Sequence, residues 1–377
     1  MNHKIKVLHV ISQLGVGGAE RMLFNLTSAG EKSLWQSTVL SLTDEGHYGP
    51  LLRKAGVEVI SVGGVKGILS PVKLFRLILL LRHRRFHLIQ SWLYHGDFLG
   101  IPLSLLLRCP LIWNLRCSSV DWKTYSPITW RIVKLLARLS RFPKAVIVNS
   151  SAGLDAHRKL GYRPRKWVNI PNGFDTKKFQ PKDKTHHDLR DTLNLPLTTR
   201  LIGTVGKWDP LKDYPTLFEG ARLLLTSQND VHFVMWGMGL TKENKELVSK
   251  LEHKKLGQNF HLMGLQPNLE NWLPGLDLFT LTSKTEGFPN VLGEAMACGI
   301  PCVSTNAGAA AEIIDQEGVV VEISNASQLM QGWVKILSLK KEEYLSLSNK
   351  VRNSVLQRYS LNTILDAYHQ LYLRTIA

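Results

Sequence analysis

The chain has 377 residues, 44% of them hydrophobic and 20% charged, and is therefore a globular protein long enough for more than one hydrophobic core. Its formal net charge is +17. No uncharged apolar stretch approaches the ~20 residues of a membrane-spanning helix, and the four cysteines lack the spacing of a disulfide framework or a metal site. These features exclude an integral membrane protein and a disulfide-stabilised secreted domain. The apolar run 7–11 is too short for the core of a signal peptide, and we expect a cytoplasmic protein.

The positive charge is concentrated in one half of the chain. Residues 1–180 hold 27 Lys and Arg against 9 Asp and Glu, whereas residues 181–377 hold 20 against 21. A net charge of +18 on one half indicates an anionic partner for that half.

The first half alternates strand-like and helix-like segments, which is typical of a parallel α/β sheet. Buried strands are expected at the apolar runs 4–12, 35–42, 57–62, 87–91, 111–115 and 144–149. The first strand leads through QLGVGG into a helical segment at 19–29. Gly17 and Gly18 allow the backbone to approach a ligand closely at the start of this helix. The spacing G-x-G-G differs from the G-x-G-x-x-G fingerprint of dinucleotide-binding proteins.

Two polar residues follow later strands of this half. His95 lies in SWLYHGDFLG, just past the strand at 87–91, and ligands of open α/β sheets bind at this edge. A packed or surface histidine without a catalytic role explains the spacing equally well. Arg116 follows the strand at 111–115 and is a second possible cation on the same side of the sheet.

Two helical segments are basic and apolar together. Residues 127–142 place Arg131, Lys134, Arg138 and Arg141 at spacings of three, four and three. The complementary face is formed by Ile132, Leu135, Leu136, Leu139 and Phe142. Residues 72–85 are apolar with a basic end. Such helices lie on anionic membranes, but a helix that packs its apolar face on its own sheet and leaves its cations in water has the same pattern.

The joint between the two halves is expected near 171–200. PNGFDTKKFQP is rich in turn residues, and the polar run KDKTHHDLRDTLNLP follows it. A cleft at such a joint is a common place for a binding site.

The second half begins with a strand at 201–205, which leads into a glycine turn with Lys207 and Lys212 and then a helix from about Tyr214. Two cations five residues apart at a strand-to-helix turn can hold a diphosphate from two sides. Further strands are expected at 231–239 and 260–268, and residues 341–377 are helical.

The segment 276–299 has the most specific pattern in the chain. A short apolar strand at 276–282 leads into a polar loop and then into a helix from Asn290, with Gly299 as its C-cap. The start of such a helix presents unpaired N–H groups to an anion. Glu286 in the loop and Glu294 one turn inside the helix can accept hydrogen bonds from hydroxyl groups. The arrangement therefore suits a ligand with both phosphate and sugar.

The string EGFPNVLGEAMACGIPCVSTNAGAAAEI, from Glu286 onward, resembles the E-x7-E region of retaining glycosyltransferases of family 4. In chain order, the GGAE loop, the loop with His95, the PNG-D…F-P segment and the segment GKWDPLK also resemble motifs of that family. The resemblance implies an α/β protein with two Rossmann-like domains that face a central cleft, the glycosyltransferase-B fold. It places a basic acceptor-binding domain at 1–180, a nucleotide-sugar-binding domain at 181–355, and a C-terminal helix at 356–377 that packs back on the first domain.

The resemblance also assigns roles to residues. His95, Glu286 and Lys212 are the implied catalytic residues, and Arg116 lies on the acceptor side. Lys207 replaces the arginine usual in the family, so the charge is kept but the bidentate fork is lost. By the same analogy, the backbone at Gly264 and Leu265 meets the base and Glu294 binds the ribose. The implied donor-binding residues are Gly17, Gly18, Gly206, Lys207, Lys212, Gly264, Leu265, Glu286, Gly287, Phe288, Pro289, Asn290, Val291, Leu292 and Glu294.

From these motifs we predict a retaining hexosyltransferase that uses a nucleotide-diphosphate sugar, with UDP as the expected nucleotide, and needs neither a cofactor nor a metal ion. The acceptor is expected to be a glycan or a lipid-linked saccharide of cell-surface polysaccharide or glycolipid synthesis. The basic helices would hold the protein peripherally on the inner face of the cytoplasmic membrane. A nucleotide-sugar epimerase on the same fold is an alternative. A nucleic-acid-binding protein would suit the isoelectric point near 9.7, but no recognition motif supports it.

Overall fold

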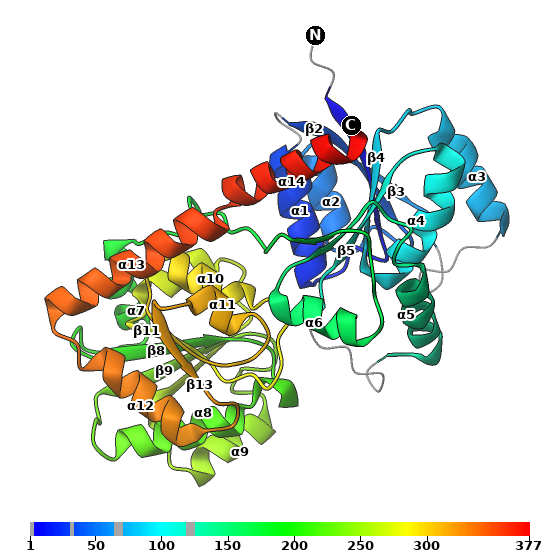
Figure 1. Cartoon of the computed structure of the whole chain (residues 1–377). Helices are drawn as coiled ribbons and strands as arrows, with labels where there is room; N and C mark the ends of the chain where they lie inside the picture. The colour runs from blue at the N-terminus through cyan, green and yellow to red at the C-terminus, as the bar shows by residue number, and fades with distance from the viewer. Residues whose placement is uncertain (1–3, 31–33, 64–70, 118–124) are drawn as a thin grey trace. The chain divides into compact units, whose positions relative to one another are not determined.

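The computed structural model describes residues 4–30, 34–63, 71–117 and 125–377. The chain forms two compact units (Figure 1), the first from residues up to Gly173 together with Leu361–Ala377, and the second from Phe174 to Ser360. The sequence placed these boundaries after residues 180 and 355. Residues 174–180 lie in the second unit because the Phe174 N–H donates to the Tyr359 carbonyl at 2.8 Å and its ring stacks on Phe288.

The first unit is built on a seven-stranded parallel sheet with the strand order β3-β2-β1-β4-β5-β6-β7. Its strands are β1 (Ile5–Ile11), β2 (Trp35–Ser41), β3 (Glu58–Ser61), β4 (Leu88–Trp92), β5 (Leu111–Leu115), β6 (Ala145–Val148) and β7 (Trp167–Asn169). The direction of strand addition reverses between β1 and β4, which pair directly. Ligands of open α/β sheets bind outside the carboxyl ends of the strands at such a reversal.

Helices cover both faces of this sheet. The helices are α1 (Gly18–Gly30), α2 (Tyr48–Lys54), α3 (Pro71–Arg82), α4 (Leu93–Leu107), α5 (Pro127–Leu139), α6 (Ser151–Lys159) and α14 (Leu361–Ile376). One core holds apolar side chains of α1, α2 and α14, and the other holds those of α3, α4 and α5. Because both faces are covered, the central strands β4 and β5 are buried along their whole length.

The C-terminal helical segment is interrupted at Ser360, between α13 (Lys341–Tyr359) and α14. The helix α14 belongs to the first unit, where the Asn114 side chain donates to the Tyr368 hydroxyl at 3.0 Å. The Tyr372 hydroxyl bonds to Gln90 of β4. These buried contacts fix α14 across the sheet.

The second unit has a six-stranded parallel sheet with the order β10-β9-β8-β11-β12-β13, which reverses between β8 and β11. Its strands are β8 (Arg200–Val205), β9 (Val231–Trp236), β10 (Phe260–Gly264), β11 (Leu278–Leu281), β12 (Cys302–Thr305) and β13 (Gly318–Val321). Its other helices are α7 (Asp183–Thr192), α8 (Tyr214–Leu225), α9 (Lys245–His253), α10 (Asn290–Ala297), α11 (Ala310–Ile314) and α12 (Ala326–Leu337). Both units are doubly wound α/β sheets, which confirms the predicted fold class.

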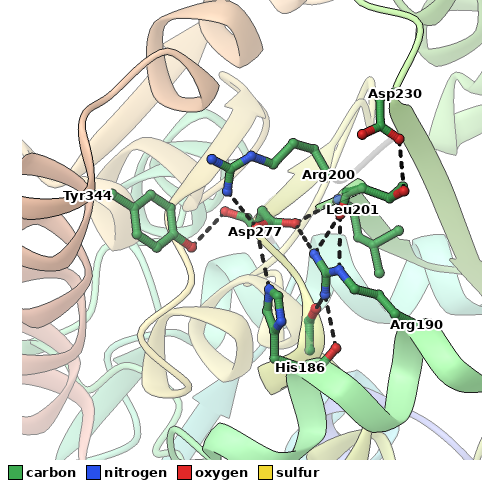
Figure 2. A network of polar contacts seen from close by, with 9 residues as sticks. His186, Arg190, Arg200, Leu201, Asp230, Asp277 and Tyr344 are labelled. Carbon is green, nitrogen blue, oxygen red and sulfur yellow. Dashed lines mark hydrogen bonds and ion pairs between the residues drawn. The ribbon is translucent and has the colours of Figure 1, made fainter. Parts of the chain in front are cut away.

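A buried polar network lies at the amino ends of β8 and β11 (Figure 2). Arg190 of α7 is fully buried and donates to Asp277 Oδ2 at 2.5 Å, and the Leu201 N–H donates to the same oxygen at 2.7 Å. Arg200 donates to the other carboxylate oxygen at 3.0 Å, while the Tyr344 hydroxyl donates to the Asp277 carbonyl at 2.8 Å. The network joins α7, β8, β11 and α13. The polar run that the sequence analysis placed at the joint therefore forms a helix anchored inside the second unit.

Within the part of the chain that the structure describes, no helix has the length and apolar character needed to cross a bilayer.

Candidate active site

The turn after β8 and the loop after β11 lie at the reversal of the second sheet, and they carry the charged side chains predicted at the donor diphosphate and the transferred sugar, Lys207, Lys212 and Glu286. The short 3-10 helix η2 (Pro210–Lys212) ends at Asp213, whose φ is +51°. A non-glycine residue in this left-handed region carries a conformational cost and persists only where its surroundings hold it. Here the hydroxyls of Thr216 and Ser324 donate to Asp213 Oδ2 at 2.9 and 2.6 Å. The conformation that positions Lys212 is thus fixed by side-chain hydrogen bonds.

The two predicted catalytic residues of this unit contact each other. Lys212 Nζ lies 2.6 Å from Glu286 Oε1, and the side chains are 23% and 15% exposed. The Ser283 hydroxyl donates to the same carboxylate oxygen at 2.6 Å. This partial burial limits solvent screening, so the pair is a stronger interaction than a surface ion pair.

The backbones on either side of this ion pair are also joined. Thr282 donates from its hydroxyl to the Lys212 carbonyl at 2.7 Å, and the Lys284 N–H donates to the Leu211 carbonyl at 2.8 Å. Thr305 of β12 donates from its hydroxyl to the Ser283 carbonyl at 2.7 Å. The turn and the loop therefore form one hydrogen-bonded structure.

Lys207 is less constrained than Lys212. Its side chain is 63% exposed, and Nζ lies 2.7 Å from Asp209 Oδ2. The hydrogen bond from Lys207 lowers the pKa of Asp209. Because this ammonium group is exposed, it can move to meet an anion, but its position is not fixed before the anion binds.

Glycines let the backbone pack closely at the carboxyl ends of β8, β9 and β10. A Cβ on Gly237, where φ is +141°, would lie 1.6 Å from the Gly206 carbonyl oxygen, and the Gly237 N–H donates to the Gly264 carbonyl at 2.7 Å. Two exposed apolar side chains, Met238 and Leu265, follow directly and are 68% and 72% exposed. Leu265 was predicted near the base, which stays a prediction, and no role was predicted for Met238.

The loop between Glu286 and α10 is held by packing. Phe288 is buried and stacks on Phe174 with ring centroids 6.1 Å apart. Gly308 has φ +59°, and a Cβ there would lie 2.1 Å from the Glu286 carbonyl oxygen, so only glycine fits beneath the loop.

The predicted donor-binding helix begins at Asn290, directly after this loop. The N-cap of α10 is Pro289, whose side chain offers no acceptor to the first N–H groups of the helix. Val291 is half-buried and Leu292 is buried. Glu294 lies within the same helix and is only 2% exposed.

In the first unit, Gly17 and His95 follow the neighbouring strands β1 and β4. A Cβ on Gly17 would lie 2.3 Å from a carboxylate oxygen of Glu20, and Gly18 starts α1. His95 lies in the first turn of α4 and is half-buried, and burial lowers its pKa, so its imidazole is neutral at pH 7. The segment read as a loop is thus a helix start, entered through Leu93 with φ +64°.

Arg116 is engaged within the first unit. Its Nη1 donates to Asn172 Oδ1 at 2.7 Å, its Nη2 bonds to the Tyr368 hydroxyl, and the guanidinium lies 5.3 Å from the centroid of the Trp92 ring. These contacts connect α14 to the end of β5. They favour a bracing role, and the acceptor-side role remains a prediction.

The basic helix α5 exposes all of its predicted cations, and Arg141, just beyond its end, is exposed as well. Its buried face consists of Val133, Leu136 and Ala137. The predicted apolar face divides between core and solvent: Leu136 is buried, whereas Leu135, Leu139 and Phe142 keep 39%, 37% and 38% of their surface exposed. They turn away from the core because the helix presents only a narrow stripe to the sheet.

In the described ranges, 4–30, 34–63, 71–117 and 125–377, His, Cys, Asp and Glu side chains form no group of three or more that could hold a metal ion.

Comparison with known proteins identifies the class to which these two units belong. Residues 16–178 match the family model described as Glycosyltransferase Family 4, and residues 199–338 match the model described as Glycosyl transferases group 1. The crystal structure of Anabaena HepE in complex with UDP has the same fold, with a TM-score of 0.85 and 22% identity over 98% of this chain and 100% of that chain. The protein is thus a glycosyltransferase of the two-domain glycosyltransferase-B class.

Two relatives of this chain have names that describe glycosyltransferases. The O-antigen biosynthesis glycosyltransferase WclY of Escherichia coli is 22% identical over 76% of this chain and 80% of its own length. The N,N'-diacetylbacillosaminyl-diphospho-undecaprenol alpha-1,3-N-acetylgalactosaminyltransferase of Campylobacter jejuni is 26% identical over 90% of this chain and 91% of its own length. Two glycosyltransferase family models thus match the chain, Glycosyltransferase Family 4 in its first half and Glycosyl transferases group 1 in its second half.

Proposed function

We propose that the protein transfers a sugar from a UDP-sugar, with retention of anomeric configuration, to a lipid-linked saccharide in cell-surface polysaccharide synthesis. The observation that carries this proposal is the partly buried Lys212–Glu286 pair at the strand reversal of the second unit. In this pair, an ammonium group that can neutralise a diphosphate lies beside a carboxylate that can accept hydrogen bonds from sugar hydroxyls. UDP as the nucleotide is supported by the UDP complex of HepE, and a lipid-linked acceptor by the name of the Campylobacter relative.

The chemical task is to expel a diphosphate from an anomeric carbon while positive charge develops on the sugar. Stabilisation of the leaving group by preorganised charge is the largest expected contribution. We assign it to Lys212, to Lys207 and to the N–H groups at the start of α10, an arrangement that works without a metal ion or a cofactor. Glu286 is assigned to hydroxyls of the transferred sugar and Glu294 to the ribose. In the first unit, the neutral imidazole of His95 is the group that we assign to the transferred sugar.

A donor screen tests this proposal. The purified protein is incubated with UDP-, GDP- and ADP-sugars, and slow hydrolysis is scored by the free nucleotide released. We expect release of UDP from one UDP-sugar. Preference for a GDP- or ADP-sugar would refute the assignment of the nucleotide, and interconversion of UDP-sugars without an acceptor would favour the epimerase alternative.

Membrane association is the part of the proposal that concerns the first unit. The helices α3, α4 and α5 pack side by side on one face of the sheet, and together they expose apolar and basic side chains to solvent. The exposed apolar side chains include Val72, Phe75, Leu79, Leu105, Leu106, Ile128, Leu135, Leu139 and Phe142. The exposed cations include Arg76, Arg108, Arg131, Lys134, Arg138 and Arg141. Mixed surfaces of this kind bind anionic bilayers, here the inner face of the cytoplasmic membrane.

We expect Arg138→Glu to weaken binding to vesicles of phosphatidylglycerol and phosphatidylcholine about tenfold or more at low salt. Each cation near an anionic surface contributes about 1 kcal/mol, and the substitution replaces an attraction with a repulsion. Co-sedimentation with vesicles measures the effect. The control is Lys335→Glu, which reverses an exposed charge of α12 in the second unit. Equal losses of vesicle binding in both variants, or no binding by the wild type, would refute the proposed membrane-binding surface. Donor hydrolysis should be unchanged by either substitution.

A further inference from the structure

Lys212 and Ser283, which both contact Glu286 Oε1, face different demands during the proposed reaction. Lys212 Nζ and Ser283 Oγ both lie 2.6 Å from this oxygen. In the proposed function Lys212 neutralises the donor diphosphate, so the approach of the donor draws its ammonium away from the carboxylate. In the proposed function, Ser283 does not bind the diphosphate. Its hydroxyl can hold Glu286 throughout the exchange.

The position of Ser283 is itself fixed. The residue is 1% exposed and lies two residues after the end of β11. Its carbonyl accepts a hydrogen bond of 2.7 Å from the hydroxyl of Thr305, which is fully buried. On the other side, Thr282 ties the same backbone to the Lys212 carbonyl at 2.7 Å. A serine side chain has one short rotor, so this hydroxyl is held in place at little entropic cost.

We propose that Ser283 is a positioning residue, which keeps the Glu286 carboxylate aimed at the transferred sugar while Lys212 exchanges that carboxylate for the donor diphosphate. The proposal rests on the proposed function. In this proposal, Lys212 pairs with Glu286 while no donor is bound. When the donor binds, that ion pair breaks, whereas the hydrogen bond from Ser283 to Glu286 persists. The sequence analysis assigned no role to Ser283.

If Ser283 has this role, its loss should affect turnover of the sugar donor and affinity for UDP differently. A UDP-sugar needs both the diphosphate contacts and a correctly placed Glu286. UDP carries the diphosphate but no transferred sugar, so its binding needs no hydrogen bond from the Glu286 carboxylate. Loss of the Ser283 hydroxyl should therefore lower turnover of the sugar donor without weakening UDP binding.

The test compares Ser283→Ala, Ser283→Thr and Ser283→Cys with the wild type. Hydrolysis is measured with the UDP-sugar, among UDP-glucose, UDP-galactose and their N-acetylated hexosamine analogues, that the wild type hydrolyses fastest. UDP binding is measured by calorimetry, and folding by thermal unfolding. The matched control is Ser304→Ala, which removes another buried serine hydroxyl, bonded to the Thr305 carbonyl at 3.0 Å and not to Glu286.

For Ser283→Ala we expect kcat/KM to fall about tenfold to a hundredfold, the range for a lost hydrogen bond to a charged group, while the Kd of UDP stays within about threefold. Ser283→Thr keeps the hydroxyl and should recover most of the turnover, and Ser283→Cys, a weak donor of similar size, should lie in between. Ser304→Ala should behave like the wild type.

Three results would overturn the proposal. They are wild-type turnover in Ser283→Ala, an equal loss of turnover and UDP affinity in that variant, and the same loss of turnover in Ser304→Ala. A wild type that hydrolyses no nucleotide sugar would instead refute the proposed function, and the role of Ser283 with it. An active wild type beside an unaffected Ser283→Ala refutes the role of Ser283 alone.

Discussion

Lys212→Ala is expected to lower kcat for donor hydrolysis and for transfer by about a hundredfold to a thousandfold, the effect of removing one preorganised group that stabilises a developing negative charge. The turn that carries Lys212 is preorganised, because the Thr216 and Ser324 hydroxyls hold Asp213, and the Lys212 side chain is only 23% exposed. Initial rates of UDP release, with the folded state checked by circular dichroism, measure the effect.

The control for this prediction is Lys207→Ala. The Lys207 side chain is 63% exposed and paired with Asp209, so its loss should cost no more than about tenfold, as for a solvent-screened charge. If Lys212→Ala retains turnover within about fivefold of the wild type, or if the two variants are equally impaired, the prediction that Lys212 contributes more to turnover than Lys207 is wrong.

Asp277→Ala is expected to destabilise the second unit by about 3–5 kcal/mol, because it leaves the fully buried guanidinium of Arg190 without its counter-charge. Urea unfolding followed by tryptophan fluorescence measures the loss. The matched control is Arg200→Ala, which removes a 3.0 Å contact to the same carboxylate from a side chain that is 50% exposed. That variant should lose no more than about 1 kcal/mol.

The destabilisation should depend on pH in a defined direction. Burial raises the pKa of Asp277, but the nearby His186 imidazole, with Nε2 3.7 Å from Oδ1, and the charge of Arg190 outweigh burial, and the net pKa lies below its ordinary value. A carboxyl group with a lowered pKa stabilises the folded state above its unfolded pKa, about 3.9, and this contribution is lost as the pH falls through the folded pKa. The difference between wild type and Asp277→Ala should be full at pH 7 and shrink below about pH 4. A difference that grows on acidification would contradict the assignment.

The central strands of both sheets were predictable from the sequence, because helices cover both faces and each of these strands is largely apolar. The edge strands β7 and β13 were not anticipated. The strand β7 has only three residues and none of them is fully buried, so it leaves no apolar run to detect.

The helix α7 shows why composition misleads at a domain boundary. Its sequence, DKTHHDLRDT, is polar and resembles a linker, yet Arg190 within it is fully buried. The partner that makes this burial possible, Asp277, lies 87 residues away. A single sequence contains no signal that links two such positions.

In the candidate site, Lys212 and Glu286 were each predicted, but their ion pair joins residues 74 positions apart and was not. Ser283 was missed although it lies at the end of a strand, three residues before Glu286, where a short hydroxyl side chain can reach back to a loop carboxylate. The start of a helix directly after β4 was also missed, because Leu93 enters it in a left-handed conformation that residues other than glycine seldom adopt.

A crystal structure of the protein soaked with UDP tests the central claim most directly. We predict that the diphosphate lies within hydrogen-bond distance of Lys212 Nζ and the first N–H groups of α10, and that the ribose hydroxyls bond to Glu294. Glu286 should then have released Lys212 while keeping the hydroxyl of Ser283. Nucleotide bound at any other place on the second unit, with the Lys212–Glu286 pair undisturbed, would contradict the account.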